Sequence, residues 1–118
     1  MICARGGGSN TFDIYDIATG KWTFGVHFHP QNEGFTTGSS YAYDGNNTVY
    51  MSRSATALVN RILALDIDTL ELRGAATTTV LQSTAHVGNF LEVVSKNGTE
   101  YLYTLQNTGT LLSRAVIL

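Results

Sequence analysis

A repeat of about 50 residues constrains this chain more than any other feature of its sequence. The segment TFDIYDIATGKW, residues 11–22, aligns with RILALDIDTLEL, residues 61–72, and this alignment matches Asp16 with Asp66. A unit of this length is too small to bury its own apolar surface, so neighbouring units must cover one another. The repeat therefore predicts several similar units stacked within one fold.

A weaker third copy extends the repeat to the end of the chain. Residues 48–65 align with residues 101–118 at an offset of 53, which matches Tyr50 with Tyr103 and Arg61 with Arg114. The whole chain has only 118 residues, enough for one small domain. We therefore expect a single domain over residues 1–118, built from units at about 1–30, 38–75 and 88–118.

The composition favours strands and turns. Charged residues make up 14% of the chain, against about 25% in an ordinary soluble domain, whereas Thr, Gly, Asn and Ser fill 44 of the 118 positions. β-Branched and aromatic residues flank the turn sequences DGNN, residues 44–47, and SKNG, residues 95–98, a pattern typical of β-hairpins. The expected strands are 11–17, 21–26, 39–43, 48–53, 61–67, 70–74, 90–94, 99–105 and 111–118.

Residues 55–72 also allow a helical interpretation. Leu58, Ile62 and Leu65 are spaced like one face of a helix, and Ala and Leu are good helix formers. The matching stretch of the first unit is rich in glycine and carries Phe12 and Tyr15, which prefer a pleated surface. The repeat therefore favours a strand here.

The first unit resembles a blade of a kelch-type β-propeller. MICARGGG, residues 1–8, would be a strand ending in a glycine cluster, and FDIYDIATGKW, residues 12–22, has the Tyr-Asp-x-x-Thr and Lys-Trp of such blades. The middle unit departs from this pattern at residues 56–58 and at Leu72, so its assignment rests on LDIDT, residues 65–69. The closing unit, residues 101–118, resembles the carboxyl ends of kelch-like propeller proteins in bacteriophage particles.

This resemblance implies an all-β fold of about two and a half antiparallel kelch-like blades. We expect the first unit to lack the strand that would precede Met1, and the last unit to stop before its outer strand. Open strand edges and uncovered blade faces then remain at both ends. The chain is therefore expected to be incomplete as a monomer.

The repeated acids are expected to be structural. Asp16 and Asp66 stand where a carboxylate accepts backbone N–H groups across a tight turn, and Trp22 can cover the blade face beside Tyr15. Asp13 and Asp68 also fall in the repeat and are interpreted as turn or edge residues. Glycines 6–8 are expected to let the backbones of neighbouring blades approach closely. A phosphate-binding loop is not expected, because the sequence around them has neither the lysine nor the helix start that such a loop needs.

Few residues suggest chemistry. His27 and His29 would point to one face of a strand, with Glu33 as a third metal ligand, but the following Pro, Asn and Gly favour a loop. His86 stands alone, and Cys3 has no histidine nearby in the sequence. We therefore expect no catalytic residue, no metal site, no cofactor and no enzymatic activity.

Possible glycosylation sites are also expected to be structural. Asn46 and Asn97 begin Asn-x-Thr patterns, but both lie in expected hairpin turns, where Asn is common.

Charge and hydropathy exclude two classes of binding partner. The net charge is −2, basic runs are absent, and no apolar stretch is long enough to span a membrane, so neither nucleic acid nor a membrane is an expected partner. The single cysteine cannot form an internal disulfide, and no leader of the signal-peptide type is visible in residues 1–8.

These properties predict a structural role. We expect a non-enzymatic component of a larger assembly. The resemblance of the closing unit implies that this assembly is a bacteriophage particle, with the chain as a head or tail protein of the virion and with copies of itself or other virion proteins as its partners. The alternative is a propeller-type module that binds carbohydrate or peptide through loops 23–37 and 77–88, with Phe24, Phe28 and Phe35 as stacking residues.

Overall fold

A computed structural model describes residues 1–5, 9, 11–27, 40–52, 62–75, 90–105 and 112–118. In these residues the chain forms ten β-strands and no helix. The expected all-β fold is therefore confirmed.

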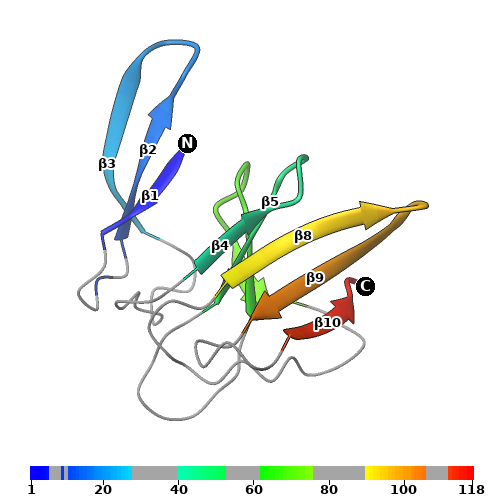
Figure 1. Ribbon diagram of the computed structural model, residues 1–118. Coiled ribbons are helices and arrows are strands. Elements are labelled where there is room, and N and C mark those ends of the chain that lie inside the picture. The colour runs from blue at the N-terminus through cyan, green and yellow to red at the C-terminus, as the bar shows by residue number, and fades with distance from the viewer. Residues whose placement is uncertain (6–8, 10, 28–39, 53–61, 76–89, 106–111) are drawn as a thin grey trace.

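The strands form three separate antiparallel sheets (Figure 1). In every sheet, consecutive strands lie side by side, and none of the sheets is closed into a barrel. The first sheet contains β1 (Ile2–Ala4), β2 (Thr11–Asp16) and β3 (Lys21–His27). The middle sheet contains β4 (Ser40–Tyr43), β5 (Thr48–Ser52), β6 (Ile62–Asp66) and β7 (Leu72–Gly74). The third sheet contains β8 (Phe90–Lys96), β9 (Thr99–Leu105) and β10 (Leu112–Val116).

The strand count agrees with a partial set of blades. The middle sheet has four strands, while each of the other two has three within the described residues. β1 corresponds to β5, because β2 and β6 are the repeated strands that follow them. The first sheet thus lacks a counterpart of β4, and the third lacks a counterpart of β7, in the part of the chain that the structure describes.

The helical interpretation of residues 55–72 is wrong over β6. This strand pairs with β5 on one side and with β7 on the other. Its first four residues, Ile62–Leu65, are all buried, because both faces of the middle sheet are covered at this strand. Such a strand has no polar alternation, and a short apolar run of this kind resembles a helix segment in sequence. Residues 53–61 lie outside the described part of the chain.

Two apolar clusters hold the sheets together. One lies between the first and middle sheets and contains Phe12, Met51, Leu63, Leu65 and Leu72. The other lies between the middle and third sheets and contains Ala42, Tyr50, Ile62, Ala64, Leu91, Leu102 and Ala115. Successive β6 residues alternate between the clusters, as the period of two in a strand requires. The sheets therefore follow one another in chain order, from the blue first sheet to the yellow and red third sheet (Figure 1).

We call the side of each sheet that is turned toward the following unit its forward face, and the opposite side its rear face. The forward face of the middle sheet carries Ile62 and Ala64, and its rear face carries Leu63 and Leu65. The first sheet covers that rear face with its own forward face, through Phe12. Two faces therefore lie at the ends of the stack: the rear face of the first sheet and the forward face of the third.

The register corrects the alignment of the third unit. Tyr50 pairs with Ala64, and Tyr103 pairs with Arg114. The match of Tyr50 with Tyr103 therefore agrees with the structure, whereas the residue equivalent to Arg114 is Ala64, at an offset of 50. The connection from β9 to β10 is three residues shorter than the connection from β5 to β6. An alignment without gaps cannot show this difference.

Turn chemistry sets the hairpin ends. Asn97 and Gly98 have φ angles of 53° and 75°, so the turn has positive φ at both central positions, as a two-residue type I′ turn requires. Lys96 pairs with Thr99 directly across it. β8 therefore runs two residues further than the expected strand 90–94.

The two faces of β9 give a stability test. Leu102 is fully buried between sheets, whereas Leu105, on the opposite face of the same strand, is 37% exposed. We expect Leu102→Ala to lower the free energy of unfolding by about 2–5 kcal/mol, and Leu105→Ala by less than about 1 kcal/mol. Urea denaturation of both variants in dilute solution measures the difference. Equal losses would contradict this two-faced arrangement.

Candidate functional site

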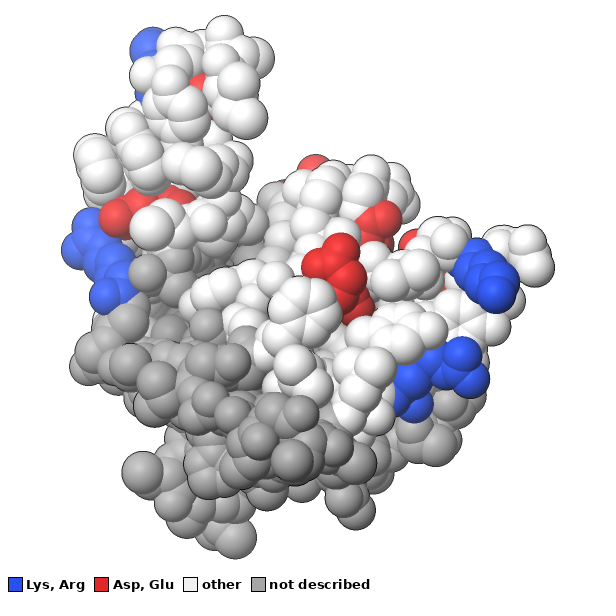
Figure 2. All heavy atoms as spheres, in the orientation of Figure 1, with Lys and Arg blue, Asp and Glu red and all other residues white. Residues whose placement is uncertain are grey.

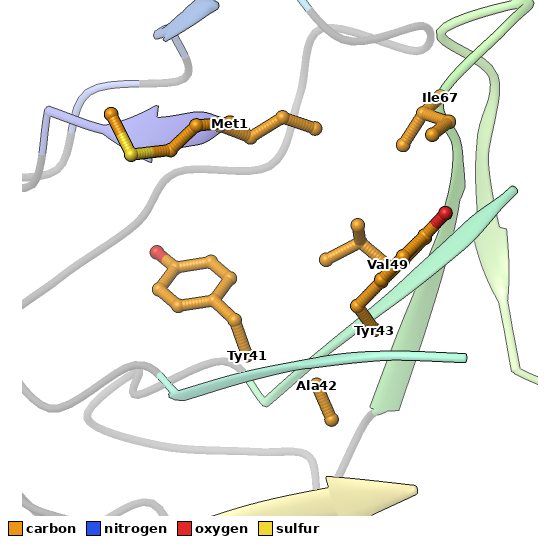
Figure 3. A pocket seen from close by; sticks show the side chains of 7 residues that line it. Met1, Tyr41, Ala42, Tyr43, Val49 and Ile67 are labelled. Atoms are coloured by element: carbon orange, nitrogen blue, oxygen red, sulfur yellow. The ribbon is translucent and has the colours of Figure 1, made fainter. Parts of the chain in front are cut away.

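A cleft lies between the first sheet and the middle sheet. Figure 2 shows the first sheet rising as a separate lobe, with a hollow between it and the rest of the molecule. The cleft has a volume of about 440 Å³ and is lined by Met1, Ile2, Tyr41, Ala42, Tyr43, Val49 and Ile67. In Figure 3 the Tyr41 ring and the Val49 side chain point into it, toward Met1, while Ala42 points away toward the third sheet.

The cleft follows from the unequal numbers of strands in the two sheets. β4 lies at the edge of the middle sheet, and its rear face carries Tyr41 and Tyr43. The described part of the first sheet ends at β1, one strand short of covering them. Tyr41 is consequently 41% exposed and Tyr43 52% exposed. The Tyr43 hydroxyl donates a hydrogen bond to the backbone oxygen of Asn46.

The lining favours apolar contacts. None of the seven lining residues has an acidic, basic or thiol side chain. Apart from the two tyrosine hydroxyls, the lining side chains are apolar. The cleft is therefore suited to holding an apolar or aromatic group by surface burial.

The forward face of the third sheet is a second candidate surface. Its cross-strand pairs form three rows: Leu112, Leu105 and Phe90; Arg114, Tyr103 and Glu92; Val116, Tyr101 and Val94. In the first row, Leu112 is 61% exposed and Phe90 is 49% exposed. Arg114 lies over the Tyr101 ring, with its guanidinium carbon 5.0 Å from the ring centroid. A face with two apolar rows at the end of a stack is the type of surface on which proteins associate.

The rear face of the first sheet carries an aromatic row. Tyr15 pairs with Trp22 across the strands, and their ring centroids are 5.0 Å apart, as the sequence predicted. Trp22 is also stacked with Phe24 at 5.8 Å, with an angle of 9° between the rings. Phe24 is 66% exposed, so the row reaches solvent. Phe28 and Phe35 lie outside the described residues.

Asp13 has a different role from the one that the sequence suggested. It lies within β2, the central strand of its sheet, and is neither a turn nor an edge residue. One carboxylate oxygen accepts the Gly25 backbone N–H at 2.9 Å, at an irregularity in the pairing with β3, and the carboxylate also pairs with Arg5 at 3.0 Å. These bonds, first from Gly25 and then from Arg5, hold the pKa of Asp13 below its usual value.

Asp16 and Asp66 do play equivalent parts in two turns. Asp16 accepts the Ala18 N–H at 2.9 Å and the Thr19 hydroxyl at 2.8 Å. Asp66 accepts the N–H groups of Asp68 and Thr69, both at 2.9 Å.

In each turn, the backbone oxygen of the aspartate also accepts an N–H from four residues further on, at Gly20 and Leu70, both at 2.8 Å. Both of these residues have positive φ, 68° and 61°. Hydrogen bonds lower the pKa of both aspartates, first from the Thr19 hydroxyl for Asp16 and first from the Thr69 backbone for Asp66. The prediction that these two acids are structural turn acceptors is confirmed.

The other residues considered from the sequence are scattered. His27 is exposed at the end of β3, and Cys3 is exposed on β1 with its thiol free. Asn46 and Asn97 lie in hairpin turns, as expected. Among the described residues, no three His, Cys, Asp or Glu side chains are grouped to hold a metal ion. Glycines 6–8, His29, Glu33 and His86 lie outside the described residues.

Sequence reasoning missed the cleft. Its one signal was the alternation of aromatic residues at Tyr41 and Tyr43, which places both rings on one face of a strand. The sequence could not show that the sheet opposite them is narrower.

A comparison with protein-family models finds none that matches this chain, and a search of curated proteins finds no match either. None of the described residues form a helix long and apolar enough to cross a membrane.

The lowered pKa values predict acid sensitivity. In the folded chain, the pKa values of Asp13, Asp16 and Asp66 lie below the usual value of 3.8. Their contribution to stability is therefore present above about pH 4 and is lost as the pH falls through the lowered folded values. We expect the midpoint of thermal unfolding, followed by circular dichroism, to fall steadily below about pH 4.

The variant Asp16→Asn serves as the control for this prediction. It keeps an acceptor oxygen but cannot titrate, so the midpoint of thermal unfolding should fall less steeply in acid. A midpoint that is independent of pH in both proteins would contradict the roles given to these carboxylates.

Proposed function

We propose that this chain is a structural, non-enzymatic component of a larger protein assembly. Copies of the chain, or other proteins, pack on the two end faces of its stack of sheets. The resemblance of its closing unit to propeller proteins of bacteriophage particles makes a phage head or tail the assembly that we propose, with the virion as the location of the protein.

The exposed forward face of the third sheet carries this proposal. The equivalent face of the middle sheet contains Tyr50 and Ile62, which are 6% and 8% exposed because another sheet covers them. In the third sheet, the corresponding strands expose Leu112 at 61%. Burying a side chain of this size contributes about 1.5–3 kcal/mol. A second protein surface on this face would therefore be stabilised by the same packing that joins the sheets within the chain.

The rear face of the first sheet is a suitable partner for that surface. Its positions are equivalent to those of Leu63 and Leu65, which the middle sheet buries against its neighbour. Here they carry Asp13 and Tyr15, beside the exposed Trp22. A contact between this face and the third sheet of another copy joins two different surfaces, so it repeats head to tail and produces a ring or a filament.

Charges on the two end faces can also pair. The third sheet presents Arg114 and Glu92, and the first sheet presents Arg5 and Asp13. Opposite charges set register and orientation more than affinity. We therefore expect affinity to come from apolar burial and to depend little on salt.

A second candidate function is a module that binds carbohydrate or peptide. The exposed Trp22 and Phe24 rings support it, because aromatic faces can stack on such ligands. Such a module would be a discrete monomer or a small ring, and its tryptophan fluorescence would respond to an oligosaccharide or a peptide. An assembly component would self-associate without any ligand.

Sedimentation of the purified chain tests the proposed function. We expect species heavier than the 12.8 kDa monomer at micromolar concentration. Leu112→Lys should weaken association by about tenfold or more, because it places a charge where apolar surface would be buried. Ser95→Lys, which adds the same charge at an exposed position near the β8–β9 turn, should leave association unchanged.

A monomer that unfolds cooperatively at this concentration would refute the assembly function. Association that is equally strong in Leu112→Lys and in the unmodified chain would refute the role of the forward face of the third sheet.

A further inference from the structure

We propose that the cleft beside β1 is an acceptor site for one extended strand of a partner protein chain. The strand pairs antiparallel with the open edge of β1 and places one large apolar side chain, opposite Ile2, in the cleft beside Tyr43, Val49 and Ile67. This inference rests on the proposed assembly function and names the kind of partner segment that one of its interfaces takes.

The other two sheets define where the strand lies. β5, the counterpart of β1, pairs with β4, and β9 pairs with β8, both antiparallel. The corresponding position beside β1 is vacant in the part of the chain that the structure describes. Two of the three sheets thus contain a strand where the first sheet has the cleft.

The backbone of β1 is oriented to accept this strand. Met1 and Tyr15 exchange two backbone hydrogen bonds of 2.8 Å, so the polar groups of Met1 point toward β2. Because these groups alternate along an antiparallel strand, the N–H and C=O groups of Ile2 and Ala4 point to the open edge. Unpaired groups of this kind are what strand addition uses.

The register specifies which partner residue enters the cleft. Ile2 pairs with Ile14, and Tyr50 pairs with Ala64, one repeat further on. Ile2 therefore corresponds to Tyr50, whose partner in β4 is Ala42. Ala42 points forward and is only 7% exposed. The partner residue opposite Ile2 would likewise point forward, into the cleft (Figure 3).

The lining restricts the chemistry of that residue. The cleft has no charged side chain to pair with a buried acid or base, and an unpaired charge is costly to bury. Its volume of about 440 Å³ exceeds what an alanine fills. We therefore expect a larger apolar residue there, with polar residues tolerated at the alternate, outward positions.

A second cleft supports this explanation of the first. It has a volume of about 280 Å³ and lies beside the end of β10, where it is lined by Tyr50, Ala64, Arg73, Gly74, Ala75, Ile117 and Leu118. The third sheet lacks a counterpart of β7 next to β10 among the described residues. Both clefts thus lie beside an edge at which a sheet is one strand short.

The test supplies the strand in a defined position. A copy of residues 40–48, which contain β4 and its turn, is fused directly before Met1. Met1 is the counterpart of Val49, because Ile2 is the counterpart of Tyr50, so the added strand has the same connection to β1 that β4 has to β5. Alanine at the position equivalent to Ala42 is replaced by leucine to fill the cleft. Hydrogen exchange followed by NMR then reports on the Ile2 and Ala4 amides.

We expect the fusion to slow exchange of these two amides by about tenfold or more. Ile67→Lys, which puts a charge in the cleft, should remove most of this protection. Ile17 is the residue of the first unit that is equivalent to Ile67. It is 77% exposed and does not line the cleft. The control variant Ile17→Lys should therefore preserve the protection. Unchanged exchange in the fusion, or equal effects of the two lysine variants, would overturn the proposal.

A second measurement covers a fusion that fails to fold. A synthetic peptide of residues 40–48, with leucine at position 42, is titrated into the unmodified chain. Slower exchange of the Ile2 and Ala4 amides supports the acceptor site. Unchanged exchange at the highest peptide concentration that stays in solution refutes it. Sedimentation is independent of this result: a chain that self-associates without accepting the strand keeps the assembly function and loses only the acceptor site.

Discussion

The structure depends on a middle sheet that is apolar on both faces. Leu63 and Leu65 point to one side of β6, and Ile62 and Ala64 point to the other. A sheet of this kind is unstable in water unless something packs on each side, because the apolar area removed from water is the main favourable contribution to folding. The flanking sheets provide that cover, one from the unit before and one from the unit after.

The same packing cannot be completed at the ends of the stack. Each outer sheet buries one face against the middle sheet and presents the other to solvent. The first sheet ends in the aromatic row of Tyr15, Trp22 and Phe24, and the third sheet ends in rows that contain Leu112 and Phe90. Repeat proteins commonly cover such ends with polar capping units. These two end faces are instead partly apolar, which supports packing against further protein.

Much of the fold could be predicted from the sequence, because local turn chemistry marks where strands end. Asp16 and Asp66 set two turns through short-range hydrogen bonds, and Asn97 with Gly98 sets a third through positive φ. Packing between sheets was harder to predict. The bond from Gly25 to Asp13 depends on an irregular pairing, which no local pattern indicates.

The cleft could not be predicted for a related reason: it depends on how many strands face each other. Within the described residues the first unit has fewer strands than the middle one, as the sequence indicated. It did not show that β4 would turn Tyr41 and Tyr43 toward the missing position, because this requires the register of β4 on β5. A shift of one residue would have exchanged their places with Ala42.

Charges distinguish the end faces from the internal ones. Asp13 of the first sheet stands where the middle sheet has Leu63. In the third sheet, Arg114 stands where the middle sheet has Ala64, and Glu92 stands where it has Ala42. A leucine or alanine inside the chain needs no partner beyond close packing. A buried charge must be paired and hydrogen-bonded to avoid a large loss of solvation energy. The end faces can therefore remain in contact with water in the isolated chain. A partner that covered them, as we propose, would have to keep every charge that it buries paired and hydrogen-bonded, which would make such a contact more selective than the contacts within one chain.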